Sequence, residues 1–138
     1  VIAAILNSLN KGKEELERDN KTLKMDQQKM RALCDKLEKA IAVSRLMDEK
    51  IAYKVEREMD QNSEEAKFIK EEVLFPLRQR IMDLQQTLSV NQQGVIALEV
   101  IMKNNLELIK GAGRTAATTV QALSTASVCA LALANQRI

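Results

Sequence analysis

The chain has 138 residues, a formal net charge of +2, 46% hydrophobic residues and 29% charged residues. This balance is typical of an ordered soluble protein, and it does not favour strong binding to nucleic acid, because a net charge of +2 is too small to neutralise many phosphates. Aromatic residues make up only 2% of the chain, with four glycines and one proline, so the composition predicts an all-α fold rather than a sheet.

Residues that commonly perform catalysis are scarce. There is no histidine, which removes the usual general base and the commonest metal ligand. Cys34 and Cys129 lie far apart and form no metal or redox spacing motif. We therefore expect no enzymatic activity, no cofactor and no metal site. The free thiols and the lack of a secretory signal favour a cytoplasmic location. Because the sequence starts at Val1, we expect it to be part of a longer protein.

The first predicted helix covers residues 1–59. Gly12 within it costs about 1 kcal/mol of helix stability without ending the helix. An apolar residue recurs at every seventh position, with polar residues at three of the companion positions. The recurring residues are Leu9, Leu16, Leu23, Met30 and Leu37, and the polar companions are Lys13, Asn20 and Gln27.

Residues 60–63 are typical of a turn, and Asn62 or Ser63 is expected to cap the next helix. The second helix is predicted over residues 63–111. Pro76 lies inside it and removes one backbone donor, so we expect a kink there.

Residues 74–112 form the clearest pattern in the chain. Apolar or amide residues recur at the a and d positions of six consecutive heptads, which is typical of a coiled coil. The a positions are Leu74, Ile81, Leu88, Val95, Met102 and Ile109, and the d positions are Leu77, Leu84, Asn91, Leu98, Asn105 and Ala112.

Residues 110–113 (Lys-Gly-Ala-Gly) are typical of a helix end, and a third helix is predicted over residues 114–137. The first two helices match in length, which predicts an antiparallel hairpin. The shorter third helix should cover one end of it and form a three-helix bundle there, in a single elongated domain. The second helix fits this expectation because it is apolar nearly all round near that end, at Ile96, Val100, Ile101, Leu106 and Leu108.

The uncharged run at residues 115–136 is long enough to span a membrane. It contains Gln121, Asn135 and many hydroxyl groups, which are unfavourable in hydrocarbon. We therefore expect a buried bundle helix.

The polar seam residues allow two interpretations. Asn91 and Asn105 occupy d positions, and Asn104 neighbours the second. The favoured interpretation is that they fix the register of helix packing. The alternative is a ligand pocket shared with Gln92 and Gln93.

Two further groups of residues are weaker candidates. Gly111, Gly113, Arg114 and Thr115 precede a predicted helix start, where backbone donors can bind an oxyanion, although a plain turn is favoured. Arg78 and Arg80 offer a partner contact. The favoured alternative for these arginines is ordinary surface pairing with the acidic residues Glu71, Glu72 and Asp83.

Several phrases of the sequence resemble the toxic-anion resistance family, also called the TelA-like tellurite resistance proteins. They are LNKGKEELERDNKTL from residue 9, FPLRQRIMDLQQTLSVNQQGVIALEVIMKNNLELIKG from residue 75, and ALANQ from residue 132. Gly113 departs from the family phrase, which has an acidic residue there. The resemblance implies a bacterial protein with a role in resistance to tellurite and similar oxyanions, and it implies no particular biochemical activity.

The sequence therefore favours a non-enzymatic helical scaffold that acts through a protein partner or through self-association. A peripheral membrane or envelope-stress component is the alternative. A thiol-dependent oxyanion reductase is a third, for which Cys34 would need an activating base or cation.

Overall fold

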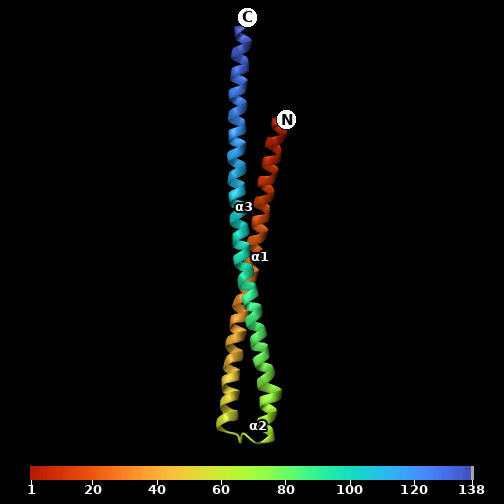
Figure 1. Cartoon of the computed structure of the whole chain (residues 1–138), viewed down its shortest axis with the longest axis vertical. Helices are drawn as coiled ribbons and strands as arrows, with labels where there is room; N and C mark the ends of the chain where they lie inside the picture. Colours follow the sequence, from red (N-terminus) through yellow and green to blue (C-terminus); the bar gives the residue numbers. More distant parts are fainter. Residues whose placement is uncertain (138) are drawn as a thin grey trace. The chain divides into compact units, whose positions relative to one another are not determined.

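The computed structural model describes residues 1–137, and these residues are almost entirely helical, with no strand among them. Helix α1 covers Ile2–Arg57, α2 covers Glu64–Ile69, the π-helical turn η1 covers Lys70–Leu74, and α3 covers Phe75–Gln136 (Figure 1). The predicted all-α class is confirmed.

The chain divides into two compact units, and α1 and α3 each contribute a segment to both. Unit 1 contains Val1–Met25 together with the chain from Leu98 onward, and unit 2 contains Asp26–Ala97. Within unit 2, α1 and α3 run antiparallel. Gln27 on α1 bonds to the carbonyl of Val95 on α3, and Asp48 bonds to Arg78.

The loop between α1 and α2 confirms the predicted cap. The Ser63 hydroxyl accepts a hydrogen bond from the Ala66 amide at 3.2 Å and donates one to the Asp60 carbonyl at 2.7 Å. The Asn62 amide donates to the Asp60 carboxylate at 3.1 Å. These bonds satisfy donors at the start of α2 that have no partner within the helix.

A π-helical turn lies directly before Pro76, where the sequence predicts a kink. The Phe75 amide donates to the Lys70 carbonyl, five residues earlier. This wider turn leaves room for the proline ring, which clashes with a carbonyl four residues back in a regular α-helix. The extra residue also lengthens the step between the buried residues Ala66 and Leu74 to eight positions. Both are buried, while Val73 is exposed.

The residues predicted at the heptad positions are shielded from solvent in the structure. From Leu74 in η1 to Ala112 in α3, every predicted a and d residue is buried or half-buried. In α1, Lys13, Asn20 and Gln27 lie at the same seam as the leucines, as predicted, and Gln27 is buried.

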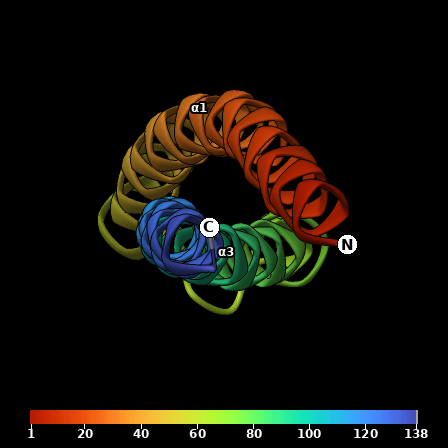
Figure 2. The same cartoon turned by 90° about the horizontal axis from the view of Figure 1, so that it is seen from above.

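The predicted end of the second helix at residues 111–113 is wrong. Helix α3 passes through Gly111 and Gly113 without a break, and Figure 1 shows it as an uninterrupted coil, which Figure 2 views from its C-terminal end. No glycine among residues 1–137 has a positive φ, so neither glycine forms the left-handed cap that the prediction required. The separate third helix, and the three-helix bundle built from it, are therefore not formed.

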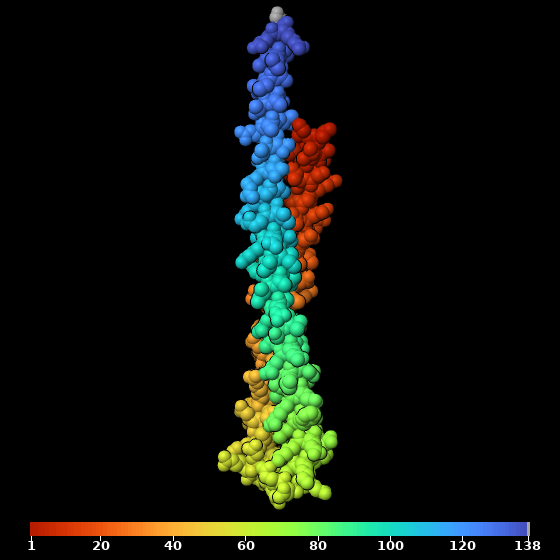
Figure 3. All heavy atoms as spheres, viewed as in Figure 1, coloured from red at the N-terminus to blue at the C-terminus, as the bar shows by residue number. Residues whose placement is uncertain are grey.

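The expected burial of the uncharged run is also wrong. Every described residue after Thr119 is exposed, and an 18-residue apolar window of the helix has no buried residue. Figure 3 shows this part of α3 in blue, with no other segment over its visible face. By length and composition alone the helix could cross a membrane, which is weak support for a membrane location.

Candidate functional site

The polar seam of unit 1 is built from two asparagines on facing helices. The Asn105 Nδ2 donates to Asn20 Oδ1 at 2.8 Å, and the Asn20 Nδ2 donates to the Met102 carbonyl at 3.1 Å. Both side chains are half-buried. The two side-chain amides bond to each other and to the backbone, as expected of a contact that sets the register of two helices.

The other predicted polar residues do not form a pocket with this pair. In unit 2 the Asn91 Nδ2 donates to the Thr87 carbonyl of its own helix at 2.8 Å. Gln92, Gln93 and Asn104 are exposed. Asn91 is therefore bonded within its own helix and the other three side chains are exposed, so these residues do not form the predicted ligand pocket.

Cys34 lies in the seam of unit 2 and is buried, as predicted for a small apolar side chain. It lines a groove of about 570 Å³, which also has Arg31, Asp35, Gln92 and Val95 in its walls. Cys129 is exposed on α3 of unit 1.

Arg78 of α3 forms an ion pair with a residue of α1 rather than with the acidic residues near it in sequence. Its Nε lies 2.8 Å from Asp48 Oδ2, and its Nη2 lies 3.1 Å from Asp48 Oδ1, in a bidentate pair between α3 and α1. Hydrogen bonds from Arg78 lower the pKa of the Asp48 carboxyl and, reciprocally, raise that of the Arg78 guanidinium. Arg80 is exposed and remains a candidate partner contact.

Residues 111–115 lie inside α3 rather than at a helix start. Backbone N–H groups in the middle of a helix bond to carbonyls four residues earlier and cannot point at an anion. The arrangement from which we inferred an oxyanion contact at Gly111, Gly113, Arg114 and Thr115 is therefore missing.

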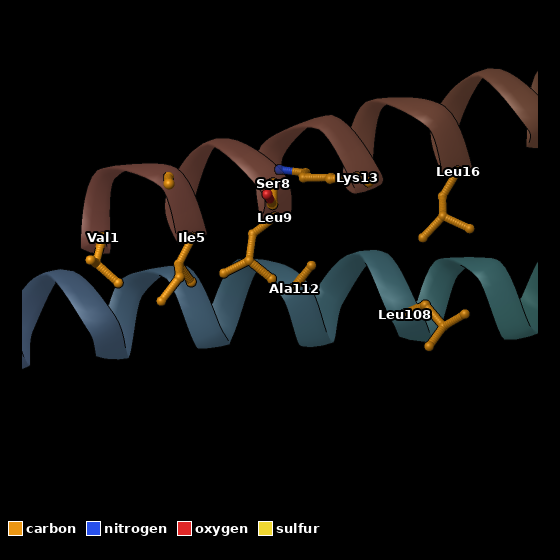
Figure 4. Close-up of a pocket in the computed structure, with 10 residues that line it drawn as sticks. Val1, Ile5, Ser8, Leu9, Lys13, Leu16, Leu108 and Ala112 are labelled. Atoms are coloured by element: carbon orange, nitrogen blue, oxygen red, sulfur yellow. The ribbon is translucent and has the colours of Figure 1, made fainter.

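Unit 1 contains an apolar groove of about 680 Å³ between the start of α1 and α3. Ile5, Leu9 and Leu16 point from α1 toward α3, and Leu108 and Ala112 of α3 form the other wall (Figure 4). Lys13 is the only charged residue among those that line it. The full lining is Val1, Ala4, Ile5, Ser8, Leu9, Gly12, Lys13, Leu16, Leu108 and Ala112.

Helix α3 exposes large apolar side chains, one of which, Leu108, also lines the groove against α1. They are between 44% and 65% exposed, and they are the residues from which the sequence predicted more than one partner. They are Ile96, Val100, Ile101, Leu106 and Leu108.

The described part of the chain offers no metal site. Residues 1–137 contain no group of three or more His, Cys, Asp or Glu side chains placed to hold a metal ion. The charged contact that sequence reasoning missed is Asp48 beside Arg78. No local signal in the sequence pointed to it, because Asp48 lies 10 residues before the loop at residues 58–63 and Arg78 lies 15 residues after it.

These features define a class: an all-α protein of antiparallel helix pairs, with a polar register contact in its seam and uncovered apolar surface on α3. The chain belongs to the toxic anion resistance protein (TelA) family, whose model matches residues 1–138. This match confirms the resemblance. No curated protein and no solved structure gave a match.

Proposed function

We propose that this chain serves toxic-anion resistance in the bacterial cytoplasm as a non-enzymatic scaffold, an antiparallel coiled coil that acts through protein–protein contacts. Membership of the family supports the resistance role. The scaffold role rests on one observation, the exposed apolar side chains of α3 between residues 96 and 108. A stretch of helix that exposes apolar side chains in several directions offers surface that a protein partner can cover.

Leu106 offers the sharpest test. It is half exposed, lies at a heptad position beside the seam, and is absent from the lining of the apolar groove. Leu106→Glu should keep the helix content and the melting temperature while it removes tellurite resistance from cells, because a charge in an apolar contact is left without a partner.

The matched control separates the scaffold from thiol chemistry. A chain with Cys34→Ser and Cys129→Ser lacks both thiols and should still confer resistance. Growth on graded tellurite, with folding checked by circular dichroism, gives the readout. The scaffold proposal is wrong if the thiol-free chain stays folded and loses resistance, or if Leu106→Glu retains it fully.

A second candidate is favoured by the exposed uncharged end of α3. An 18-residue window there has a mean hydropathy of 1.4 and no buried residue. On this candidate the chain is a peripheral membrane component. Flotation with liposomes tests it: the chain should rise with the vesicles, and a chain that stays at the bottom of the gradient rules it out.

A further inference from the structure

Helix α1 of unit 2 has an exposed face on which every charged side chain is basic. The side of α1 that meets α3 is marked by a seven-residue repeat of buried or half-buried residues, Gln27, Cys34, Ile41, Asp48 and Val55. The residues two, five and six positions after each of these, from position 29 to position 57, lie on the far side of the helix and are all exposed. We call them the basic face. At 1.5 Å per residue, it is about 42 Å long.

The charged residues of this part of α1 are sorted by their position around the helix. Between residues 29 and 57, every acidic side chain lies outside the basic face, at Asp35, Glu38, Asp48, Glu49 and Glu56. Six cations lie on it, at Lys29, Lys36, Lys39, Lys50, Lys54 and Arg57. Neither of the ion pairs found within residues 1–137 involves one of these six. The basic face therefore offers an anionic partner six charges that no ion pair in the described chain neutralises.

Large apolar side chains lie among the cations. They are between 43% and 60% exposed, and they are Leu33, Val43, Leu46, Met47 and Tyr53. Val43, Leu46 and Met47 are spaced as neighbours on one helix surface, with lysines before and after them. The Arg57 guanidinium lies 5.8 Å from the centre of the Tyr53 ring, so a cation and an aromatic ring lie side by side. A basic, amphipathic helix of this kind is typical of a membrane-surface contact.

We propose that the basic face of α1 binds the surface of a membrane that contains anionic lipids. The six cations lie among the phosphate groups of the lipids, and the apolar side chains enter the boundary between the headgroups and the acyl chains. Lysine suits both regions, because its long apolar stem can lie in the boundary while its ammonium group remains at the phosphates. The Tyr53 ring, with its polar tip, also favours this interface.

Two other kinds of partner fit the basic face less well. A second copy would bring six cations against six cations, which repel each other. A nucleic acid would offer phosphates to the cations, but contacts to its backbone would leave Val43, Leu46 and Met47 in water. Each of these partners therefore leaves one part of the face unsatisfied.

An acidic helix of another protein is the closest competitor. A groove that encloses α1 is excluded, because the opposite side of α1 already packs on α3. A single helix packed along α1 would use two rows of side chains, as at a coiled-coil seam. The apolar side chains of the basic face occupy three adjacent rows, represented by Val43, Leu46 and Met47. This broad, convex surface favours a flat partner that can deform around it.

The inference rests on the peripheral-membrane candidate and deepens it, because it names the lipid class and the helix that binds it. The uncharged end of α3 would bind vesicles whatever the charge of their headgroups, whereas the attraction of six cations requires anionic lipid. Vesicles with and without anionic lipid therefore separate the two surfaces.

Vesicle binding by the whole chain tests the lipid class. The chain should bind vesicles of equimolar phosphatidylcholine and phosphatidylglycerol at least about 100-fold more tightly than vesicles of phosphatidylcholine alone, because each cation near an anionic surface contributes about fivefold. High salt should remove most of this difference, since it screens the charges of an exposed face. Co-sedimentation over a range of lipid concentrations gives the affinities.

Two double variants test whether the basic face is the contact. Lys36→Gln with Lys50→Gln removes two cations from it and should weaken binding to the anionic vesicles at least about tenfold. Arg31→Gln with Arg45→Gln is the matched control, because it removes the same charge from two exposed positions with the same spacing, outside the basic face. The control should weaken binding less than about threefold, since its charges lie farther from the lipid.

Leu46→Gln tests the apolar part of the basic face. It should weaken binding at least about threefold, because it removes apolar surface that enters the interface. Val90→Gln is its control and should leave binding unchanged, since Val90 is 66% exposed but lies on α3. Circular dichroism verifies that every variant is helical.

Equal binding to neutral and anionic vesicles would overturn the inference and leave the membrane candidate standing, and binding to neither would overturn both. Equal losses in the two double variants would show that the net charge of the chain, rather than the basic face, attracts the lipid. If no vesicle is bound and Lys36→Gln with Lys50→Gln removes tellurite resistance, the basic face contacts an acidic protein instead. The scaffold proposal is tested apart from these results, by Leu106→Glu in cells.

Discussion

Asn20 and Asn105 are hydrogen-bonded to each other across the seam of unit 1, at 2.8 Å between Asn105 Nδ2 and Asn20 Oδ1. The Asn20 amide also donates to the Met102 carbonyl. An apolar side chain beside one remaining asparagine would leave a half-buried amide without its partner. The pair therefore ties one position of α1 to one position of α3 and excludes neighbouring registers.

Replacement of one asparagine should destabilise the chain, and replacement of both should not. Asn105→Leu is expected to cost about 1–2 kcal/mol, because Asn20 Oδ1 loses its hydrogen-bond donor. The double variant Asn20→Leu with Asn105→Leu should melt higher than the single variant and at least as high as the unmodified chain. Urea unfolding of the four proteins gives the coupling between the two positions. Additive effects would show that the hydrogen bond does not matter.

The Asp48–Arg78 pair should contribute stability only where Asp48 is ionised. Hydrogen bonds from Arg78 lower the folded-state pKa of Asp48 below its ordinary value of 3.8. Its contribution is therefore present above the unfolded pKa and is lost as the pH falls through the lower folded pKa. Asp48→Asn should cost at most about 1 kcal/mol at pH 7, because Arg78 is largely exposed.

Thermal unfolding at several pH values checks this prediction. The difference between Asp48→Asn and the unmodified chain should shrink from about pH 4 downward, and it should also shrink in high salt. A difference that is constant with pH would mean that the charge of Asp48 is not responsible.

The π-helical turn η1 should require both the extra residue between Ala66 and Leu74 and the proline at position 76. Deletion of Glu72 restores a seven-residue step between Ala66 and Leu74, but it returns the Pro76 ring to a regular α-helix. We expect that deletion to cost about 3 kcal/mol. With Pro76→Ala in addition, most of the loss should be recovered. A double-mutant cycle in urea measures this coupling, and equal losses in the two backgrounds would contradict it.

Gly111 and Gly113 distinguish the continuous helix from the turn that the sequence suggested. A β-carbon at Gly113 would have nothing within 4 Å, and one at Gly111 would have only the end of the Arg114 side chain at 3.9 Å. Alanine at each position should therefore stabilise the helix by about 0.5–1 kcal/mol. Calorimetry measures the effect. A loss of stability would indicate a left-handed glycine at that position.

The sequence predicted the seam well because a heptad pattern reports directly on which residues of a helix are covered. Leu74, Ile81 and the positions that follow them needed no knowledge of the partner helix. Asp48 was missed because its pairing with Arg78 joins residues 30 positions apart.

The third helix was predicted wrongly for a different reason. Gly111 and Gly113 can end a helix or continue it, and the choice depends on a backbone angle that the residue type leaves open. Alanine-rich sequence follows them and favours a helix. The low charge of residues 115–136 indicated that something covers them, but it could not show whether a segment of the same chain does so.

The extra residue in η1 also limits how the chain can change in length. One residue added or removed within α1 or α3 would rotate every later seam position by about 100° and turn its side chain away from the opposite helix. The turn at Lys70–Leu74 already accommodates one such residue, next to the loop. Insertions and deletions among related chains should therefore concentrate between Asp60 and Leu74. Elsewhere, only the loss or gain of seven residues from both helices together would leave the remaining seam residues facing each other.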